Sequence, residues 1–380
     1  MLNIAQKFNK NSQILVKLLP VFSFVVPLLI LYSLYPNSFE ATWKGRTYYL
    51  FFLWLVSLEI ILGWDEIQTS KVDKLRSIRT LAFVISLLLP TIYVLIANFL
   101  GLNPALVDLA KQSDMGSWWA EFMPLSIEYL VFGVIFAVIS LIGYGKEGLG
   151  DFSISSLLLF TVGTLYLVDN FYPYGQFTPF QFLVLPTTIL AANGLNLMGY
   201  QTTVIITTNS YYGWLPYLTA WDPKNPSTRA AYGIGWPCAG VESLMIYTVT
   251  IFLFLKRSTI PLKQKIIYFI IGAVVTYFIN ILRIVTIFLI AMNNGDVGIF
   301  HDFYGQLYSI TWIISYPLII IGSRFLWGKI RELRARSNVS TDISLTHNII
   351  STLAILVSLH SKSVSHSKWT NKASNRQAWD

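Results

Sequence analysis

Cys238, Arg283 and His301 together supply the residue types that nucleophilic catalysis by a thiol uses. Cys238 is the only cysteine among 380 residues, and His301 is the only one of the four histidines that precedes residue 347. A cysteine thiolate is a nucleophile, a histidine can serve as its general base, and a cation can stabilise an oxyanion. Together the three types indicate acyl-transfer chemistry, provided that the fold brings them to one place.

The surroundings of Cys238 predict the start of a helix. Cys238 follows Pro237 in the sequence GWPCAGVESL and precedes an apolar run. Because proline is common in the first turn of a helix, we expect Cys238 at a helix N-terminus, where the helix dipole and free N–H groups stabilise a thiolate. The same N–H groups can bind an oxyanion. The alternative interpretation is that Cys238 is a small buried apolar residue.

Arg283 lies inside an apolar run, FINILRIVTIFL. An arginine at membrane depth costs about 2.5–3.5 kcal/mol on insertion scales, so such residues usually have a function. Thr276, Asn280 and Arg283 are spaced four and three residues apart and share one helix face. We expect Asn280 to support the site by orienting Arg283. The alternative is a structural ion pair of Arg283, for example with Glu59 or Glu128.

His301 lies in the sequence FHDFYGQLYS, just before the last apolar run. The spacing of His301, Tyr304 and Tyr308 places them on one face of a helix. A single histidine at a membrane interface is often a packing residue, and this alternative stays open for His301 considered by itself.

The composition indicates the class of protein that must position these residues. Hydrophobic residues make up 54% of the chain and charged residues 12%, against about 25% charged in an ordinary globular domain, and the mean hydropathy is +0.57. These values exclude a soluble globular domain, and a single cysteine excludes a disulfide scaffold or a cysteine-rich metal site. A polytopic membrane protein is the remaining class.

Eight apolar runs are candidates for membrane-spanning helices, which take about 20 residues each. They cover residues 14–35, 47–64, 80–100, 124–144, 152–168, 241–255, 266–290 and 307–327. The first run is too long for the core of a signal peptide and lacks a cleavage site, so we expect an uncleaved anchor.

Basic residues predict the orientation, because short cytoplasmic loops are enriched in lysine and arginine. The connectors 65–79 and 256–265 and the segment after the last run are basic, so we expect them and the N-terminus in the cytoplasm. Lys44 and Arg46 oppose this rule weakly. With the N-terminus and the connector 256–265 both inside, the stretch 179–200 cannot cross the membrane fully. We expect it to be an interfacial or re-entrant helix on the outer side. The net charge of +8 follows from the same bias and needs no nucleic-acid partner.

The predicted fold is therefore an all-α polytopic membrane protein with about eight transmembrane helices and a small outer cap of loops and short strands. The outer segment is 169–238, where residues 202–208 are β-branched and predict a strand. Residues 209–236 are rich in Tyr, Trp, Pro and Asn and predict loops with turns. Residues 1–328 would form the transmembrane catalytic domain, and residues 329–380 a basic, flexible cytoplasmic tail.

This topology places Cys238, Arg283 and His301 at the outer ends of three consecutive spans. The order Cys-Ala-Gly-Val at 238–241, Asn-x-x-Arg-Ile at 280–284 and then His301 resembles the exosortase/archaeosortase family over most of the hydrophobic body. The stretch WKGRTYYLFFLWLVSLE at 43–59 is most similar to the archaeosortases of ammonia-oxidising archaea.

The resemblance implies a membrane-embedded cysteine protease and transpeptidase in the cell membrane that needs no cofactor and no metal. Its partners would be envelope proteins whose C-terminal sorting signal has a short motif, a transmembrane helix and a basic tail. It would cleave this signal on the extracytoplasmic side and transfer the protein to an amine, such as that of a membrane lipid. Cys238 would be the nucleophile, His301 the proton carrier and Arg283 the oxyanion stabiliser.

Two other functions remain open at this level. A transporter or channel would use Glu59, Glu128 and Arg283 along a path, but it predicts two related halves, and the sequence shows no repeat. A lipid-linked glycosyl- or phosphotransferase needs an outer acidic pair for a metal. The outer acidic residues form no tight pair in the sequence, and they are Asp108, Asp114, Glu121, Asp169, Asp222, Asp296 and Asp302.

Overall fold

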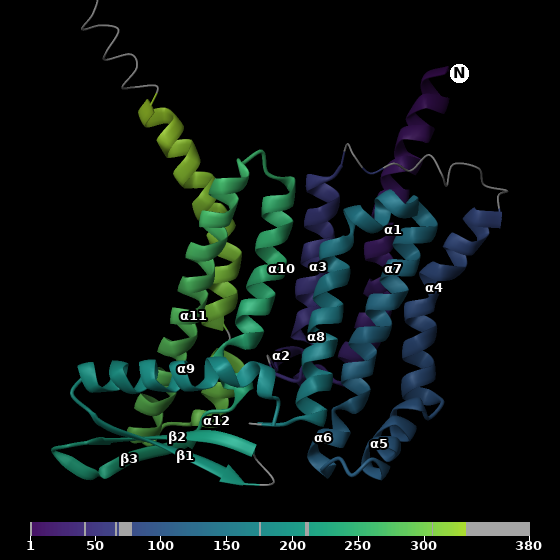
Figure 1. Ribbon diagram of the computed structural model, residues 1–380. Coiled ribbons are helices and arrows are strands. Elements are labelled where there is room, and N and C mark those ends of the chain that lie inside the picture. The colour runs from purple at the N-terminus through teal and green to yellow at the C-terminus, as the bar shows by residue number, and fades with distance from the viewer. Residues whose placement is uncertain are drawn as a thin grey trace, which may run out of the picture. The chain divides into compact units, whose positions relative to one another are not determined.

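The computed structural model describes residues 2–41, 43–64, 67, 78–174, 176–209, 213–305 and 307–331. This part of the chain is mostly helical and contains one small antiparallel sheet, which confirms the predicted fold class (Figure 1). The chain forms two compact units, Met1–Pro317 and Leu318–Asp380, and the first contains the elements that position the site. The predicted tail lies outside the described residues from residue 332 onward.

Each predicted span corresponds to a helix in the described part of the chain. The helices before the sheet are α1 (Leu2–Leu34), α2 (Pro36–Glu40), α3 (Thr47–Leu62), α4 (Ile78–Phe99), α5 (Leu102–Gln112), α6 (Ser117–Glu121), α7 (Met123–Asp151), α8 (Ser153–Phe171) and α9 (Thr178–Leu197). After the sheet follow the short turn η1 (Trp236–Ala239), α10 (Val241–Arg257), α11 (Leu262–Met292), α12 (Val297–Ile299), the π-helical turn η2 (Phe300–Tyr304) and a C-terminal helix, Leu307–Arg331.

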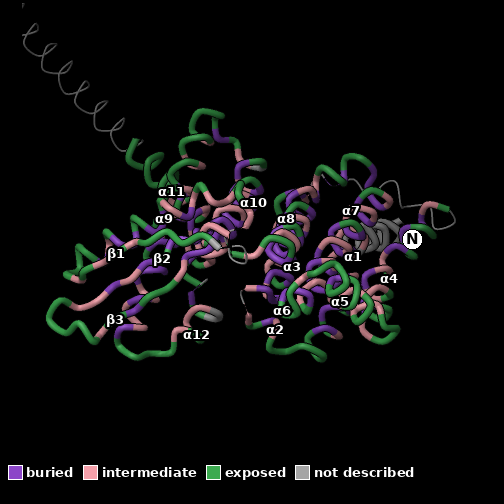
Figure 2. Tube along the Cα trace, turned by 60° about the horizontal axis from the view of Figure 1, so that its bottom comes forward, coloured by how far each residue is buried: buried purple, intermediate pink, exposed green. Residues whose placement is uncertain are grey.

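Aromatic side chains join α1, α3 and α7. Phe24 packs edge-on against Phe52 and Phe132, with ring centroids 5.1 and 5.3 Å apart, and Phe52 packs edge-on against Phe136 at 5.0 Å. Aromatic rings favour this edge-on arrangement. Figure 2 shows where residues are buried in this part of the molecule. Many residues of α3 and α8 are buried, whereas α5 is largely exposed.

The number of helices that are long and apolar enough to cross a membrane is seven among the described residues. This set omits two of the eight predicted spans, α3 and α10, because they have only 16 and 17 residues. At a rise of 1.5 Å per residue, such helices are shorter than a hydrocarbon core of about 30 Å. Both nevertheless run alongside the longer helices, and both contact α8 (Figure 1).

The set also includes α9, for which the sequence predicted no full crossing. By length and apolarity α9 could span a membrane, but it lies crosswise to α8, α10 and α11 (Figure 1). It packs on the sheet and on α11. The length of α9 is therefore that of a membrane-spanning helix, whereas its direction differs from that of the other candidate spans.

The sheet consists of β1 (Gln201–Asn209), β2 (Gly213–Asp222) and β3 (Asn225–Gly233), in the order β1-β2-β3. The predicted strand at 202–208 is confirmed, but the prediction of loops over 209–236 is wrong. In β2, Leu218 and Ala220 are buried and Tyr217 is exposed, which is the alternation of a strand with one covered face. The Tyr, Trp and Pro content hid this alternation, because those residues also mark turns.

Lys44 and Arg46, which opposed the charge rule, are both buried in ion pairs. Lys44 Nζ lies 2.8 Å from Asp169 Oδ2. Arg46 binds Glu128 through two parallel hydrogen bonds of 2.8 and 2.9 Å, and Tyr49 donates to the same carboxylate at 2.9 Å. Each positive charge is therefore neutralised inside the protein, so this loop does not act as a basic loop.

The pair Arg46–Glu128 makes a testable contribution to stability. Arg46→Met leaves the Glu128 carboxylate buried without its partner, so we expect the free energy of unfolding to fall by about 3–5 kcal/mol. Arg46→Met/Glu128→Leu removes both charges and should lose much less. Denaturant unfolding in detergent measures both variants. A single variant as stable as the unmodified protein, or a double variant less stable than the single one, would contradict the assignment.

Candidate active site

Cys238 lies in η1, a single 3₁₀ turn, and its backbone N–H donates to Gly235 O at 3.0 Å. The turn is anchored by Trp236, whose buried indole N–H donates to Tyr172 O at 3.2 Å. The prediction that Cys238 begins a long helix is wrong in detail, because Gly240 interrupts the helical path and α10 begins at Val241. Cys238 therefore belongs to a separate turn before the helix.

Asn280 on α11 holds this turn. Its Nδ2 donates to the backbone carbonyl of Cys238 at 2.9 Å. Gly240 has φ +89°, and a Cβ at this position would lie 3.0 Å from Asn280 Nδ2. Only glycine adopts this backbone conformation readily, and only glycine leaves room for Asn280. The sequence predicted a supporting role for Asn280 through Arg283, whereas the contact observed is with Cys238.

The polar face of α11 is buried, as the spacing of Thr276, Asn280 and Arg283 predicted. Arg283 forms no ion pair with Glu59 or Glu128, the two partners that the sequence suggested. Glu128 binds Arg46, and Glu59 accepts hydrogen bonds from the backbone N–H groups that open α8. Arg283 donates from Nη2 to His301 O at 3.4 Å, and its Nε is buried without a hydrogen-bond partner among the described residues.

His301 lies in η2, where the chain forms a wide π-helical turn instead of the regular helix that the sequence predicted. Tyr304 and Tyr308 are 57% and 52% exposed, whereas His301 is half-buried and lines a pocket. The turn follows α12, whose first turn is capped by Asp296, which accepts from Ile299 N at 2.9 Å.

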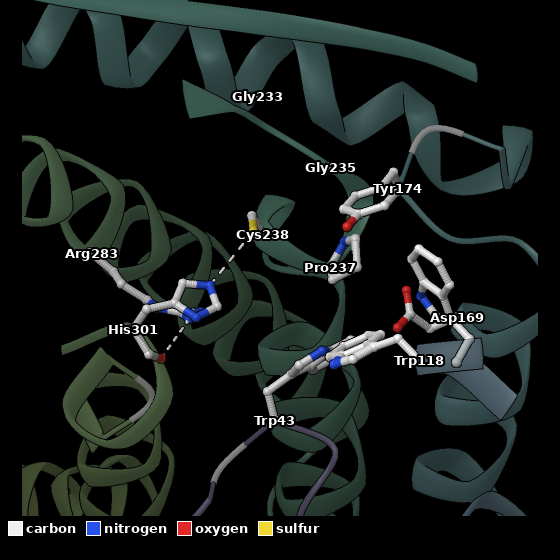
Figure 3. Close-up of a pocket in the computed structure, with 11 residues that line it drawn as sticks. Trp43, Trp118, Asp169, Tyr174, Gly233, Gly235, Pro237, Cys238, Arg283 and His301 are labelled. Carbon is white, nitrogen blue, oxygen red and sulfur yellow. Dashed lines mark hydrogen bonds between the residues drawn. The ribbon is translucent and has the colours of Figure 1, made fainter. Parts of the chain in front are cut away.

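The pocket brings the three chemically competent residues together, with His301 between Cys238 and Arg283 (Figure 3). Cys238 Sγ lies 4.0 Å from His301 Nε2, which is the outer limit of a hydrogen bond to sulfur. The volume of the pocket is about 300 Å³. Its lining comprises Trp43, Trp118, Trp119, Asp169, Tyr174, Gly233, Gly235, Pro237, Cys238, Arg283 and His301.

The sequence did not predict the aromatic wall of the pocket, which consists of Trp43, Trp118, Trp119 and Tyr174. Trp118 and Trp119 come from α6, and Trp118 also stacks over the ammonium of Lys44 at 4.7 Å. Asp169 reaches the pocket while it pairs with Lys44. No local pattern joins these positions, although a tryptophan pair in an outer connector and an acid at the end of a span were visible signals.

The surroundings of Cys238 favour its thiolate. Burial opposes the charged form, but the hydrogen bond and charge of His301, together with the charge of Arg283, outweigh burial and lower the pKa of the Cys238 thiol. At Lys44 the balance is the reverse, since burial lowers the pKa of its ammonium despite the neighbouring Asp169. The geometry thus places a thiol of lowered pKa beside an imidazole and near a guanidinium whose Nε has no hydrogen-bond partner among the described residues.

Other acidic groups near the site have different partners. Glu242 accepts a hydrogen bond of 2.6 Å from the Tyr48 hydroxyl. Among the described residues, no three His, Cys, Asp or Glu side chains gather in a way that would hold a metal ion.

Comparison with known protein families shows a match over most of the chain. The family model for transmembrane exosortase (Exosortase_EpsH) matches residues 21–320, a range that includes Cys238, Asn280, Arg283 and His301. No curated protein and no solved structure matches the chain.

The role of His301 in activating the thiol can be measured directly, because Cys238 is the only cysteine. Only the thiolate reacts with iodoacetamide, so the alkylation rate rises with pH through the thiol pKa. We expect a midpoint below that of a free cysteine, which is about 8.5. His301→Gln removes the hydrogen bond and charge that lower this pKa, so the midpoint should move to higher pH and the rate at pH 7 should fall.

Tyr304→Phe is the matched control, because Tyr304 lies in the same turn but is exposed. It should leave the pH profile unchanged. An identical profile for His301→Gln and the unmodified protein would show that His301 does not act on the thiol.

Proposed function

The chain belongs to the transmembrane exosortase family, a family of multi-pass membrane cysteine transpeptidases that process C-terminal sorting signals, and we propose that Cys238, His301 and Arg283 are its catalytic residues. The observation that carries the proposal is the distance of 4.0 Å between Cys238 Sγ and His301 Nε2 in a pocket that Arg283 also lines. The proposed substrates are envelope proteins that end in a short motif, a transmembrane helix and a basic tail.

The first half of the proposed reaction forms a thioester. The Cys238 thiolate attacks the carbonyl carbon of the scissile peptide bond, and the negative charge moves to the carbonyl oxygen. When the tetrahedral intermediate collapses, the C–N bond breaks and protonated His301 gives its proton to the leaving amine. The leaving group is the transmembrane helix with its basic tail.

Arg283 is the proposed stabiliser of the oxyanion. Its guanidinium carries five N–H donors, and the contact with His301 O uses only one of them among the described residues. Donors that are already oriented and partly shielded from water stabilise a developing charge without reorganisation. The contact with His301 also ties the cation to the base.

The second half of the proposed reaction releases the product. Neutral His301 accepts a proton from an incoming amine, the amine nitrogen attacks the thioester carbon, and the C–S bond breaks to restore the thiolate. The proposed acceptor is an amine on a membrane lipid. Water in the same position would give hydrolysis instead.

We also propose that the site faces the extracytoplasmic side and that both termini are cytoplasmic. Basic connectors at 65–79 and 256–265 support this orientation. The neutralisation of Lys44 and Arg46 by buried carboxylates removes the main exception to it. The similarity of residues 43–59 to archaeosortases of ammonia-oxidising archaea supports a place in that subgroup.

Co-expression with a protein that carries such a sorting signal tests the function. The unmodified enzyme should produce a shortened protein whose new C-terminus, by mass spectrometry, bears an added amine. Cys238→Ala should leave the signal intact, because no thioester can form. Thr286→Ala, a change at a half-buried position of α11 whose hydroxyl donates to Leu282 O in the same helix, should behave like the unmodified enzyme. Processing that survives in Cys238→Ala would rule out the mechanism.

The position of Arg283 depends on Gly305. A Cβ at Gly305 would lie 2.6 Å from Arg283 Nε, so Gly305→Ala must displace the guanidinium. A displacement near 1 Å can reduce a rate by about 100-fold, so we expect kcat to fall by roughly ten- to a hundredfold with little change in KM. Gly322→Ala is the control, since a Cβ there has open space. An unchanged kcat for Gly305→Ala would exclude Arg283 from the transition state.

A further inference from the structure

A second cavity, here called the lateral groove, lies between α3, α10 and the C-terminal helix. Its volume is about 240 Å³. Leu50 and Trp54 of α3, Ile246 of α10, and Ile310 and Ile314 of the C-terminal helix line it. Leu50 is 54% and Ile314 37% exposed, whereas Ile246 is buried, so the groove has an apolar floor and an open side.

The only hydroxyl groups in the lining are already bound within the protein. Thr47 Oγ1 lies 2.8 and 2.7 Å from Phe39 O and Ala41 O, which share its one hydroxyl proton. The Tyr48 hydroxyl donates to Glu242 at 2.6 Å. Apart from the indole N–H of Trp54, the side chains of the lining offer a polar ligand no further donor. Such a ligand would lose more hydrogen bonds to water than it gains, which leaves an apolar occupant as the favourable one.

The groove continues the catalytic pocket along the chain. Three of the segments that line the pocket also line the groove, five to nine residues further on. The pairs, with the pocket residue first, are Trp43 and Tyr48, Cys238 and Ile246, and His301 and Ile310. A substrate that leaves Cys238 in the direction of α10 therefore meets the groove directly.

The distance along α10 sets the register of such a substrate. The turn at 238–240 and the helix from Val241 to Ile246 together rise roughly 12 Å. A helical substrate that runs beside α10 covers this distance in about eight residues. The volume of the groove suits one or two large apolar side chains, as when a ridge of one helix fills a groove between others.

We propose that the lateral groove binds the transmembrane helix of the sorting signal and holds a large apolar side chain about eight residues after the scissile bond. This inference rests on the proposed function and adds the surface that the substrate recognises. The groove then fixes the depth of the substrate helix, and the depth decides which peptide bond reaches Cys238.

Photo-crosslinking tests the contact. A benzoyl-phenylalanine at position 50, in the Cys238→Ala protein that retains its substrate, should label the substrate helix about eight residues after the cleavage site. The matched control is position 88 on α4, where Leu88 is 56% exposed and outside the groove. Labelling of lipid alone from position 50, or equal labelling of the substrate from both positions, would overturn the proposal.

Filling the groove separates this proposal from the function itself. Leu50→Trp should lower kcat/KM by about tenfold for a substrate with its helix, because a blocked apolar pocket has effects of that size. It should leave cleavage of a short peptide that has the motif but no helix unchanged, and Leu88→Trp should alter neither rate. If the unmodified enzyme cleaves neither substrate, the function and the groove assignment both fail. If it cleaves both and Leu50→Trp spares both or impairs both equally, only the groove assignment fails.

Discussion

The hydrogen bond from Asn280 Nδ2 to the Cys238 carbonyl, 2.9 Å long, fixes the nucleophile to the longest helix of the first unit apart from α1. Arg283 lies three residues further along the same helix and contacts His301 O. One rigid element thus sets the positions of the thiol turn, the cation and the base. The close approach of the turn requires the left-handed backbone of Gly240, so a small residue and an amide together determine the geometry of the site.

Charged residues are scarce in this chain, and each buried one can be described by the partner that compensates its charge. The buried ones in the described part are Lys44, Arg46, Glu59, Glu128, Asp169, Glu242 and Arg283. Lys44 pairs with Asp169, and Arg46 pairs with Glu128. Glu59 accepts from backbone N–H groups, and Glu242 accepts from a tyrosine hydroxyl. Among the described residues, the one hydrogen bond of Arg283 is long and goes to a carbonyl. Burying a cation so incompletely paired is unfavourable for folding, and the pocket beside it is where a substrate would supply the missing acceptor.

The sequence predicted those features that depend on local pattern. Apolar runs located the helices, the spacing of Thr276, Asn280 and Arg283 predicted a buried polar face, and β-branched residues predicted β1. The order of spans predicted that Cys238, Arg283 and His301 would meet, and the structure places them around one pocket. Features that depend on distant partners were missed. The ion pairs of Lys44 and Arg46, the aromatic wall and the π-helical turn at His301 have no periodic signature, and the alternation in β2 was obscured by residues that also form turns.

The hairpin of β2 and β3 has one end at the pocket and the other end exposed, away from the pocket lining. Gly233 at one end lines the pocket, while the turn at 222–225 at the other end is exposed and is closed locally by Asp222, which accepts from Lys224 N. Substitutions or insertions at the exposed end would leave the thiol turn and α11 untouched. Related enzymes could therefore diverge at this rim and acquire new preferences during evolution without rebuilding the machinery that breaks the peptide bond.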